Sequence, residues 1–486
     1  MKLILKGKIN KTYVQTLCIM FFHGEKFPLN DDNEDNYIEV KQTEDDNGIS
    51  AFCTLFYNGK MAHGRGYAYY NPDEAIERTS KTAVGKAVYQ AGAQVTGKEI
   101  PWGILTGIRP SKVAYEVLKL HNKEEANDVL IDRYLLSPTK AELCLDVAQN
   151  EYSIVNQYSD KACSVYISIP FCPSRCTYCS FISYATKKLF DLIPDYIEAI
   201  KKELSQKASI IKKLNLEITS LYIGGGTPTT LNSQQLQDLL SYISLVINVK
   251  DLKEFTVECG RPDTITLEKL LILEKYGVNR ISINPQTLND EVLCRIGRKH
   301  TVDDFFKAYT IAKQNTSLTI NVDLIAGLEG DTIESFKSTI DKIIELGPQN
   351  ITVHSFSVKK SAQALADDKG VYELNGDFAK ESVDYAYKTI RDHNYQPYYM
   401  YRQKNTISDL ENVGYSKQDY FSIYNILMMS DCHTVFGIGA GASTKLVKNV
   451  CGKNEILRIF SPKYPYEYLK DKKDKTQDIF DFFKEV

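Results

Sequence analysis

Residues 164–181 read SVYISIPFCPSRCTYCSF, and they give the clearest indication of the fold. Its first part, SVYISIP, is a nearly continuous apolar run of the length expected for a strand buried on both faces. Similar runs recur along the chain and are separated by stretches with helical spacing. They are SLYIGGG (220–226), EFTVECG (254–260), RISINPQ (280–286), LTINVDLIAG (318–327) and NITVHSFS (350–357). This alternation predicts an α/β fold, a partial (β/α)₆ barrel over residues 159–370, with a doubly wound parallel sheet as the alternative.

The segments on either side of the predicted barrel have a different pattern. Residues 1–158 predict an N-terminal α+β domain, with a helix over 73–97 and further helical stretches up to residue 158. Its β-rich runs are KLILKG (2–7), TYVQTLCIMFF (12–22), YIEVKQT (37–43) and ISAFCTLFY (49–57). Residues 371–486 are expected to form an α-rich C-terminal extension that caps the substrate side of the barrel.

Composition excludes several classes of protein. The 486 residues include 59 Lys and Arg against 62 Asp and Glu, a net charge of −3, which argues against a broad basic surface for nucleic acid. No run of about 18 apolar residues is present, so no membrane span is expected. The N-terminus has only a four-residue apolar stretch, shorter than a secretory signal requires. We therefore expect a cytoplasmic protein whose 11 cysteines are thiols, metal ligands or catalysts.

Three cysteines directly follow the first predicted barrel strand. Cys172, Cys176 and Cys179 have the spacing C-x₃-C-x₂-C, which indicates a site for a soft metal. A structural zinc site is closed by four protein ligands. Three thiolates instead suit a [4Fe–4S] cluster that keeps one iron open for a ligand. The spacing favours the cluster, and zinc or plain thiols are the alternatives.

Several longer phrases resemble one known family. C-x₃-C-x₂-C after the first barrel strand is the signature of radical S-adenosylmethionine (SAM) enzymes. The wider phrases are similar to the oxygen-independent coproporphyrinogen III oxidase family: YISIPFCPSRCTYCSF (166–181), LYIGGGTPTTL (221–231), INPQTLNDEVLCRIGRKH (283–300) and NVDLIAGL (321–328). Further phrases resemble its HemZ branch: PWGILTGIRPSK (101–112), YRQKN (401–405), LENVGY (410–415) and GIGAGAS (437–443).

The resemblance implies a cofactor set and a reaction. The cofactors are a [4Fe–4S] cluster on the three cysteines and one or two molecules of SAM, the source of a 5′-deoxyadenosyl radical. The implied activity is oxidative decarboxylation of propionates of coproporphyrinogen III to vinyl groups, giving protoporphyrinogen IX in anaerobic haem biosynthesis. Such an enzyme needs an electron donor, expected to be a ferredoxin or flavodoxin, and an electron acceptor that the resemblance does not identify.

The resemblance also implies which residues bind SAM. The expected cofactor-binding residues are Tyr178, Gly224, Gly225, Gly226, Thr227, Glu258, Gln286, Arg298 and Asp323. Tyr178 is placed near adenine, the glycines near the SAM amino group and Arg298 at the SAM carboxylate, whereas the other polar residues close apolar runs and are expected at one end of the barrel. Each set has an alternative interpretation: a turn for the glycines, loop packing for Tyr178, and solvent contact for the polar residues at strand ends. Tyr166 is the catalytic candidate near the cluster, with a core position as its alternative.

Substrate contacts are the least specified part of the site. Arg402 and Lys404 are candidates for substrate carboxylates, because Arg and Lys pair well with them. The basic residues of the first domain are expected to be a solvated helix face: Arg78, Lys81, Lys86, Arg109 and Lys112. His354 is expected to be structural. The chain departs from the family at Ser168, where a His is common, and at Phe181, where the main oxidases have a fourth Cys. Phe181 favours a haem-binding chaperone as an alternative function, and a radical methyltransferase or cyclopropanase is another.

Overall fold

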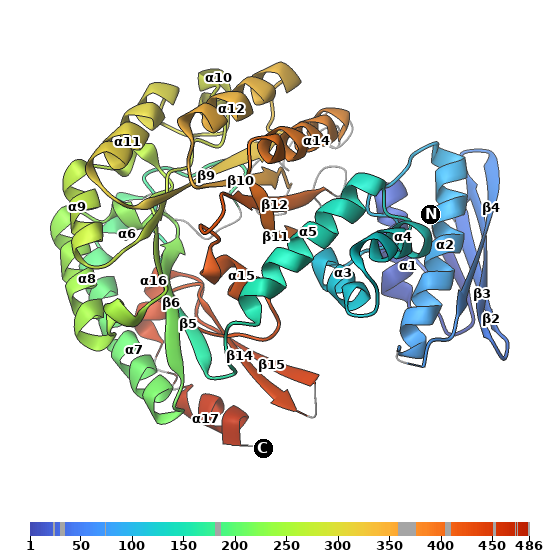
Figure 1. Cartoon of the computed structure of the whole chain (residues 1–486), viewed down its shortest axis with the longest axis horizontal. Helices are drawn as coiled ribbons and strands as arrows, with labels where there is room; N and C mark the ends of the chain where they lie inside the picture. Colours follow the sequence, from blue (N-terminus) through green and yellow to red (C-terminus); the bar gives the residue numbers. More distant parts are fainter. Residues whose placement is uncertain are drawn as a thin grey trace. The chain divides into compact units, whose positions relative to one another are not determined.

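The computed structural model describes the chain except for residues 23–24, 30–34, 73, 180–185, 358–375, 404–409, 451–452, 472, 474 and 485–486. The described residues form two compact units (Figure 1). The boundary between the units falls within helix α5 (Pro138–Val155), between Gln149 and Asn150.

The first unit combines a four-stranded sheet with helices, so the predicted N-terminal α+β organisation is confirmed. The strand order is β1-β2-β3-β4, with β1 parallel to β2 and the other pairs antiparallel. The long helix α2 packs on β3 and β4, and α1 packs against α2. The elements are β1 (Lys2–Lys6), α1 (Lys11–Phe21), β2 (Tyr37–Glu44), β3 (Gly48–Tyr57), β4 (Lys60–Tyr69), α2 (Ile76–Thr96), α3 (Pro110–Leu118) and α4 (Lys123–Tyr134).

The prediction of a strand over residues 12–22 is wrong, because this segment forms helix α1. The Asn10 side chain caps the helix by accepting a hydrogen bond from the Tyr13 backbone N–H at 3.0 Å. The buried side chains Tyr13, Leu17 and Phe21 recur every four residues, which is helical spacing. The Val, Thr and Tyr content favours a strand only weakly, and burial against α2 overrides that propensity.

The second unit is built on an 11-stranded sheet that contains all six predicted barrel strands. Neighbours follow chain order from β5 to β10, and each pair is parallel. A doubly wound sheet would reverse its strand order, so the partial barrel is confirmed. The strands are β5 (Ala162–Ile169), β6 (Glu217–Gly225), β7 (Glu254–Glu258), β8 (Arg280–Ser282), β9 (Thr319–Ala326) and β10 (Asn350–Ser355).

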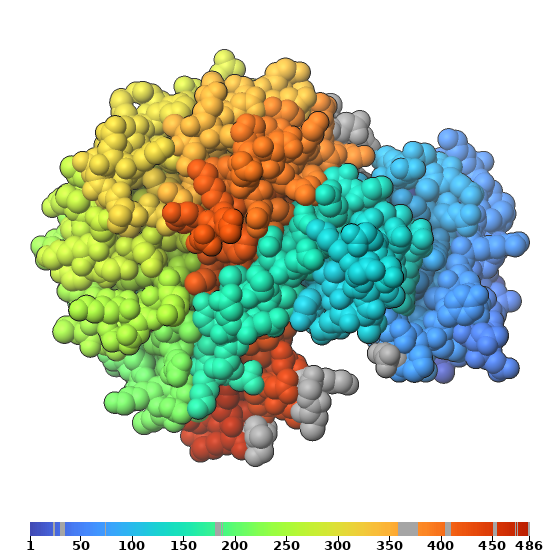
Figure 2. Space-filling view, in the orientation of Figure 1, coloured from blue at the N-terminus to red at the C-terminus, as the bar shows by residue number. Residues whose placement is uncertain are grey.

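Helices lie along the outside of the curved sheet (Figure 1). In the space-filling view, the green to yellow atoms of residues 193–346 cover the outer side of this unit on the face shown (Figure 2). Each of the long helices buries an apolar stripe, such as Ile200 and Leu204 of α7. The helices are α6 (Lys187–Phe190), α7 (Ile193–Lys213), α8 (Ser233–Val246), α9 (Leu267–Lys275), α10 (Asp290–Arg295), α11 (Val302–Asn315), α12 (Ile333–Leu346) and α14 (Gly376–Asp392).

The C-terminal part contains the expected helices and adds strands that were not predicted. Strand β13 pairs in parallel with β5, whereas β12 pairs antiparallel with β10, so this part extends the barrel sheet at both edges. The elements are β11 (Gln396–Arg402), β12 (Glu411–Ser416), α15 (Ile423–Met429), β13 (Thr434–Ile438), β14 (Ser443–Val450), β15 (Lys453–Phe460), α16 (Pro465–Lys470) and α17 (Thr476–Lys484).

The short helix α15 lies inside the ring of strands and is anchored at both of its ends (Figure 1). At its N-terminus, the buried Glu254 carboxylate accepts hydrogen bonds from Ser422 Oγ at 2.9 Å and from the Ile423 N–H at 2.7 Å. At its C-terminus, the buried Lys445 ammonium donates to the carbonyls of Met428 at 2.9 Å and Ser430 at 2.6 Å. A negative charge at the N-terminus and a positive charge at the C-terminus both complement the helix dipole.

Candidate active site

The cysteine loop lies at the carboxyl end of β5 and is held by backbone hydrogen bonds. The Thr227 N–H donates to the Phe171 carbonyl at 2.8 Å, and the Thr177 N–H donates to the Ile296 carbonyl at 3.0 Å. The loop is therefore fixed by the end of β6 on one side and by the residues after α10 on the other. Cys172 is buried, whereas Cys176 and Cys179 are partly exposed.

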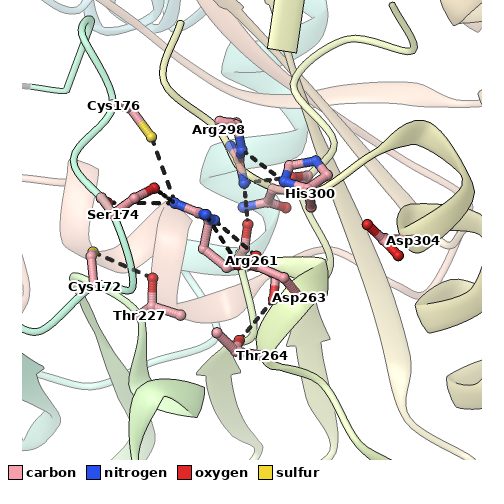
Figure 3. Close-up of polar contacts among 12 residues, drawn as sticks. Cys172, Ser174, Cys176, Thr227, Arg261, Asp263, Thr264, Arg298, His300 and Asp304 are labelled. Atoms are coloured by element: carbon pink, nitrogen blue, oxygen red, sulfur yellow. Dashed lines mark hydrogen bonds and ion pairs between the residues drawn. The ribbon is translucent and has the colours of Figure 1, made fainter. Parts of the chain in front are cut away.

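The polar surroundings of Cys172 and Cys176 suit thiolate ligands. Cys172 Sγ lies 3.4 Å from the Thr227 hydroxyl, and Cys176 Sγ lies 4.0 Å from Arg261 Nη1 (Figure 3). Across the described residues, no three Cys, His, Asp or Glu side chains gather closely enough to share a single metal ion. In a [4Fe–4S] cluster each thiolate binds a different iron, so the ligands need not converge on one point. The donor set therefore fits the cluster.

The glycine run at the end of β6 allows a close approach between chain segments. Gly225 has a φ of +109°, which is unfavourable for other residues. A Cβ atom at Gly224 would lie 2.7 Å from Glu258 Oε1, and one at Gly226 would lie 2.7 Å from the Phe171 carbonyl oxygen. The glycines thus let the backbone of β6 reach both Glu258 and the cysteine loop.

Glu258, the last residue of β7, is a buried carboxyl group with two donors. The Tyr222 hydroxyl donates to Oε1 at 2.7 Å, and the Gly225 N–H donates to Oε2 at 3.1 Å. Burial raises the pKa of Glu258 to about 7, an effect that Asp323 reinforces and that the hydrogen bond from Tyr222 opposes. This carboxyl group therefore changes its charge near neutral pH.

Tyr166 belongs to a stack of three tyrosine rings. The Tyr222 and Tyr424 rings lie 4.4 Å apart, and the Tyr166 ring lies 6.1 Å from Tyr222 and 6.4 Å from Tyr424. The three come from β5, β6 and α15. Burial raises the pKa of Tyr166, so its hydroxyl is neutral. The stack contacts Glu258 through the hydrogen bond that the Tyr222 hydroxyl donates to it.

Gln286 has the backbone and side-chain features of a ligand-binding residue. It lies four residues beyond β8 rather than at its end, and pairs as an isolated bridge with Leu324 of β9. Its φ is +72°, a strained value for a residue other than glycine. Its Oε1 is buried and accepts no hydrogen bond from the described residues. A buried acceptor without a donor fits a ligand that brings a hydroxyl or amino group.

Asp323 lies within β9, so the prediction that it ends the strand is wrong. Its carboxylate accepts hydrogen bonds from Asn284 Nδ2 at 2.8 Å and from Asn321 Nδ2 at 2.6 Å. His354 Nε2 lies 3.8 Å from Asp323 Oδ2, and the Tyr401 hydroxyl lies 3.5 Å from His354 Nδ1. Burial favours a higher pKa for Asp323, but His354 and the hydrogen bonds together hold this pKa below its usual value. Asp323 is thus a charged acceptor, and His354 is one of its partners.

Arg298 connects the cysteine loop to the barrel. Its Nη1 donates to the Tyr178 hydroxyl at 3.0 Å, and its Nη2 donates to the carbonyls of Gly260 at 2.6 Å and Asn284 at 2.9 Å. Its Nε donates to His300 Nδ1 at 3.4 Å. A guanidinium has five N–H groups, so these contacts leave one N–H on Nη1 for a ligand carboxylate. The hydrogen bond from Arg298 fixes the position of the Tyr178 hydroxyl.

The candidate substrate residues are less well placed by the structure. Arg402 is buried at the end of β11. Lys404 lies outside the described residues, and so does Phe181, where the main oxidases of the family have a fourth Cys.

In the first unit, Lys81 pairs with Glu77 at 2.8 Å within helix α2, whereas the half-buried Arg78 donates to the Tyr134 hydroxyl at 3.0 Å. Arg109 and Lys112 lie at the start of α3, so the five basic residues do not share one solvated helix face.

Residue patterns alone did not identify Tyr222, Asn284, Arg261 or His300 as part of this site. A signal for Tyr222 was present, because it lies two positions before Gly224 and therefore on the same face of the strand. Arg261 and His300 lie in irregular segments after β7 and α10, where the sequence has no period that would place a side chain.

Comparison with known proteins identifies the family. Residues 166–343 match the model of the radical SAM superfamily. HemZ of Bacillus subtilis, an oxygen-independent coproporphyrinogen-III oxidase-like protein, is 36% identical over 86% of this chain and 84% of its own. The heme chaperone HemW of Bacillus subtilis is 36% identical over 40% of this chain and 51% of its own.

Among solved structures, the fold is similar to that of coproporphyrinogen III oxidase, HemN, from Escherichia coli. The TM-score is 0.51 with 20% identity, over 70% of this chain and 72% of that chain. No helix in the described parts of the chain has the length and apolar character needed to cross a membrane.

The family match and the similarity to HemZ show that the chain belongs to the radical SAM superfamily, in the oxygen-independent coproporphyrinogen-III oxidase-like family that includes HemZ. The cofactors of this superfamily are a [4Fe–4S] cluster and S-adenosylmethionine.

Proposed function

We propose that this protein catalyses the oxygen-independent decarboxylation of coproporphyrinogen III to protoporphyrinogen IX in haem biosynthesis. The observation that carries the proposal is the 36% identity with the oxidase-like protein HemZ, which extends over 86% of the chain. The reaction removes one hydrogen atom, one CO₂ and one electron from each of two propionates and leaves a vinyl group at each position.

Cys172, Cys176 and Cys179 would hold the [4Fe–4S] cluster. Gln286, with its unpaired buried Oε1, and the carboxylates of Glu258 and Asp323 would accept hydrogen bonds from SAM hydroxyl and amino groups. When bound, the cluster and SAM supply a 5′-deoxyadenosyl radical by reductive cleavage.

The remaining site residues orient the ligand and exclude water. Tyr178 would stack on adenine, and the one uncommitted N–H of Arg298 would meet the SAM carboxylate. Gly224–Gly226 and Thr227 would line the ligand with backbone groups. The stack of Tyr166, Tyr222 and Tyr424 would close the interior below it with apolar rings.

Substrate carboxylates would be bound at the rim of the barrel. Arg402, at the end of β11, and Lys404, two residues later in the sequence, are the proposed partners, since both are cationic. A ferredoxin or flavodoxin would deliver the electron to the cluster, and an electron acceptor must take up the electron released at each propionate.

An anaerobic turnover assay tests the proposal. Reconstituted protein is mixed with coproporphyrinogen III, SAM and a reductant, and 5′-deoxyadenosine and porphyrins are followed by chromatography and mass spectrometry. The expected result is loss of two CO₂ units per substrate, abolished by Cys172→Ala, Cys176→Ala or Cys179→Ala. Deoxyadenosine without decarboxylated porphyrin would overturn the assigned substrate.

A haem-binding chaperone is the second candidate, because HemW proteins are among the relatives. Stoichiometric haem binding by the purified protein, without decarboxylation, would favour this function. Transfer of a labelled methyl group from SAM would instead favour a methyltransferase or cyclopropanase.

A further inference from the structure

We propose that Arg261 is a positioning residue that holds the cysteine loop and raises the reduction potential of the cluster bound there. The inference rests on the proposed cluster ligands and concerns a residue outside the C-x₃-C-x₂-C motif. Arg261 follows β7 by three residues and precedes the short 3₁₀ segment Pro262–Thr264.

Arg261 makes its loop contacts through one nitrogen. Nη1 donates to Ser174 Oγ at 2.9 Å and to the Ser174 carbonyl at 3.5 Å, and lies 4.0 Å from Cys176 Sγ (Figure 3). Ser174 Oγ in turn donates to the Gly297 carbonyl at 3.1 Å. The guanidinium thus holds the middle of the loop, between the first and second cysteines, and directs an N–H group toward a sulfur.

The opposite edge of the same guanidinium is held by a carboxylate. Nε and Nη2 donate to the two oxygens of Asp263 at 3.1 and 3.2 Å, in a bidentate pair. The Arg261 side chain is 5% exposed, so the fork has little freedom to move. Nη1 is the edge that faces away from Asp263, and it is this edge that meets the loop.

A hydrogen bond also fixes the backbone of Arg261. The Thr264 hydroxyl donates to the Arg261 carbonyl at 2.7 Å and lies 2.6 Å from the Thr229 hydroxyl. Lys269 Nζ donates to the carbonyls of Thr229 at 2.6 Å and Thr264 at 3.1 Å. Thr229 lies two residues after Thr227, so Arg261 is anchored to the segment that contacts Cys172.

Arg261 and Arg298 donate hydrogen bonds to different parts of the loop, although the charge of Arg298 also acts on Cys176. Arg298 contacts Tyr178, next to Cys179, and holds it to the barrel through carbonyl groups. Among the described residues, Arg261 is the arginine that donates to Ser174 and directs an N–H toward Cys176 Sγ. Hydrogen bonds and positive charge at a ligand sulfur stabilise the more negative, reduced form of a cluster. Removing this charge should therefore lower the reduction potential.

The test is an EPR-monitored potentiometric titration of the full-length reconstituted protein. A photoreduced deazaflavin supplies the single electron that converts the cluster from the 2+ to the 1+ state. Arg261→Met should shift the reduction equilibrium about tenfold toward the oxidised form, which is about 59 mV for a one-electron couple. Arg261→Lys should recover at least half of that shift, because the charge is retained. Asp263→Asn should shift the potential in the opposite direction, because the neutralising carboxylate is lost.

Arg458→Met is the matched control, since this arginine is exposed on β15, and its potential should equal that of the wild type. Loss of iron from Arg261→Met with an unchanged potential in the remaining clusters would overturn the electrostatic part and leave only a structural role. An unchanged potential at full iron content would overturn the whole inference. If Arg261→Met does not fold, the sign of the shift in Asp263→Asn decides. A wild-type cluster that persists in the cysteine variants would overturn the proposed ligands, and this inference with them.

Discussion

At the scale of single residues, Glu258 is the group most sensitive to pH. Its pKa is about 7 in the folded chain, against about 4.5 when exposed. Between these values the unfolded chain binds fewer protons, so this group makes the free energy of unfolding fall as pH rises from about 4.5 to 7, by about 3 kcal/mol in total. Above about pH 8 its contribution is constant.

We expect Glu258→Gln to remove this part of the pH dependence. Urea unfolding of wild type and variant at several pH values between 4.5 and 8 measures it, with the exposed Glu217→Gln as the matched control. SAM affinity of the reconstituted wild type should rise as pH increases through 7, since the carboxylate is the stronger acceptor. If the free energy of unfolding changed with pH equally in wild type and Glu258→Gln, burial would not be the cause of the raised pKa of Glu258.

Tyr222 supports Glu258 with a hydrogen bond of 2.7 Å while its ring packs against Tyr424 at 4.4 Å. Tyr222→Phe keeps the ring and removes the donor. Because a hydrogen bond to a charged acceptor is worth more than one to a neutral acceptor, the loss of stability should be about 1.5–3 kcal/mol at pH 8 and smaller at pH 6. Denaturant unfolding at the two pH values checks this, and an equal loss at both would show that the hydroxyl does not act through the charge of Glu258.

At the scale of elements, helix α15 depends on charged groups supplied by distant strands. Lys445 of β14 is 3% exposed and donates to carbonyl groups at the end of the helix, including Ser430 at 2.6 Å. We expect Lys445→Met to leave these carbonyls without their donor and to cost about 2–4 kcal/mol. The near-UV circular dichroism of the tyrosine stack should weaken as Tyr424 loses its position.

The matched control is Lys463→Met, which removes an exposed lysine from the same C-terminal part. Its free energy of unfolding should equal that of the wild type. If Lys445→Met were as stable as this control, the anchoring of α15 would have to come from Glu254 and apolar packing alone.

At the scale of the whole molecule, all described residues of the proposed site belong to the second unit. The described site residues run from Tyr166 to Arg402, whereas the described residues of the first unit end at Gln149. A ligand stabilises the part of a protein to which it binds. Assembly of the cluster and binding of SAM should therefore slow amide exchange in peptides that contain residues 222–227, 256–263 and 284–300.

Hydrogen–deuterium exchange with mass spectrometry, on the full chain with and without SAM, makes this comparison. Peptides from β2 and β3 of the first unit should exchange at the same rate in both states. Protection confined to the first unit would place the ligand elsewhere and would contradict the site.

The sequence by itself determined the barrel and the position of its cysteine loop. Parallel strands buried on both faces must be nearly continuous apolar runs, so β5 to β10 could be predicted from local composition. The position of Cys172 after β5 followed from chain order alone. The positions of Glu258, Gln286 and Asp323 near strand ends were predicted approximately, although Asp323 lies within β9 and Gln286 lies beyond β8.

The tertiary structure alone decided the contacts between segments distant in the chain. Thr434 of β13 pairs with Cys163 of β5, and Tyr424 reaches Tyr222 from a helix some two hundred residues later in the chain. The hydrogen bond from Arg261 to Ser174 also joins segments that are far apart in the sequence. Short-range periodicity reports which face of an element is buried, but it does not report which partner buries it. Charge pairing and burial in the folded chain select that partner, and they also set the pKa of Glu258 and the environment of the cysteines.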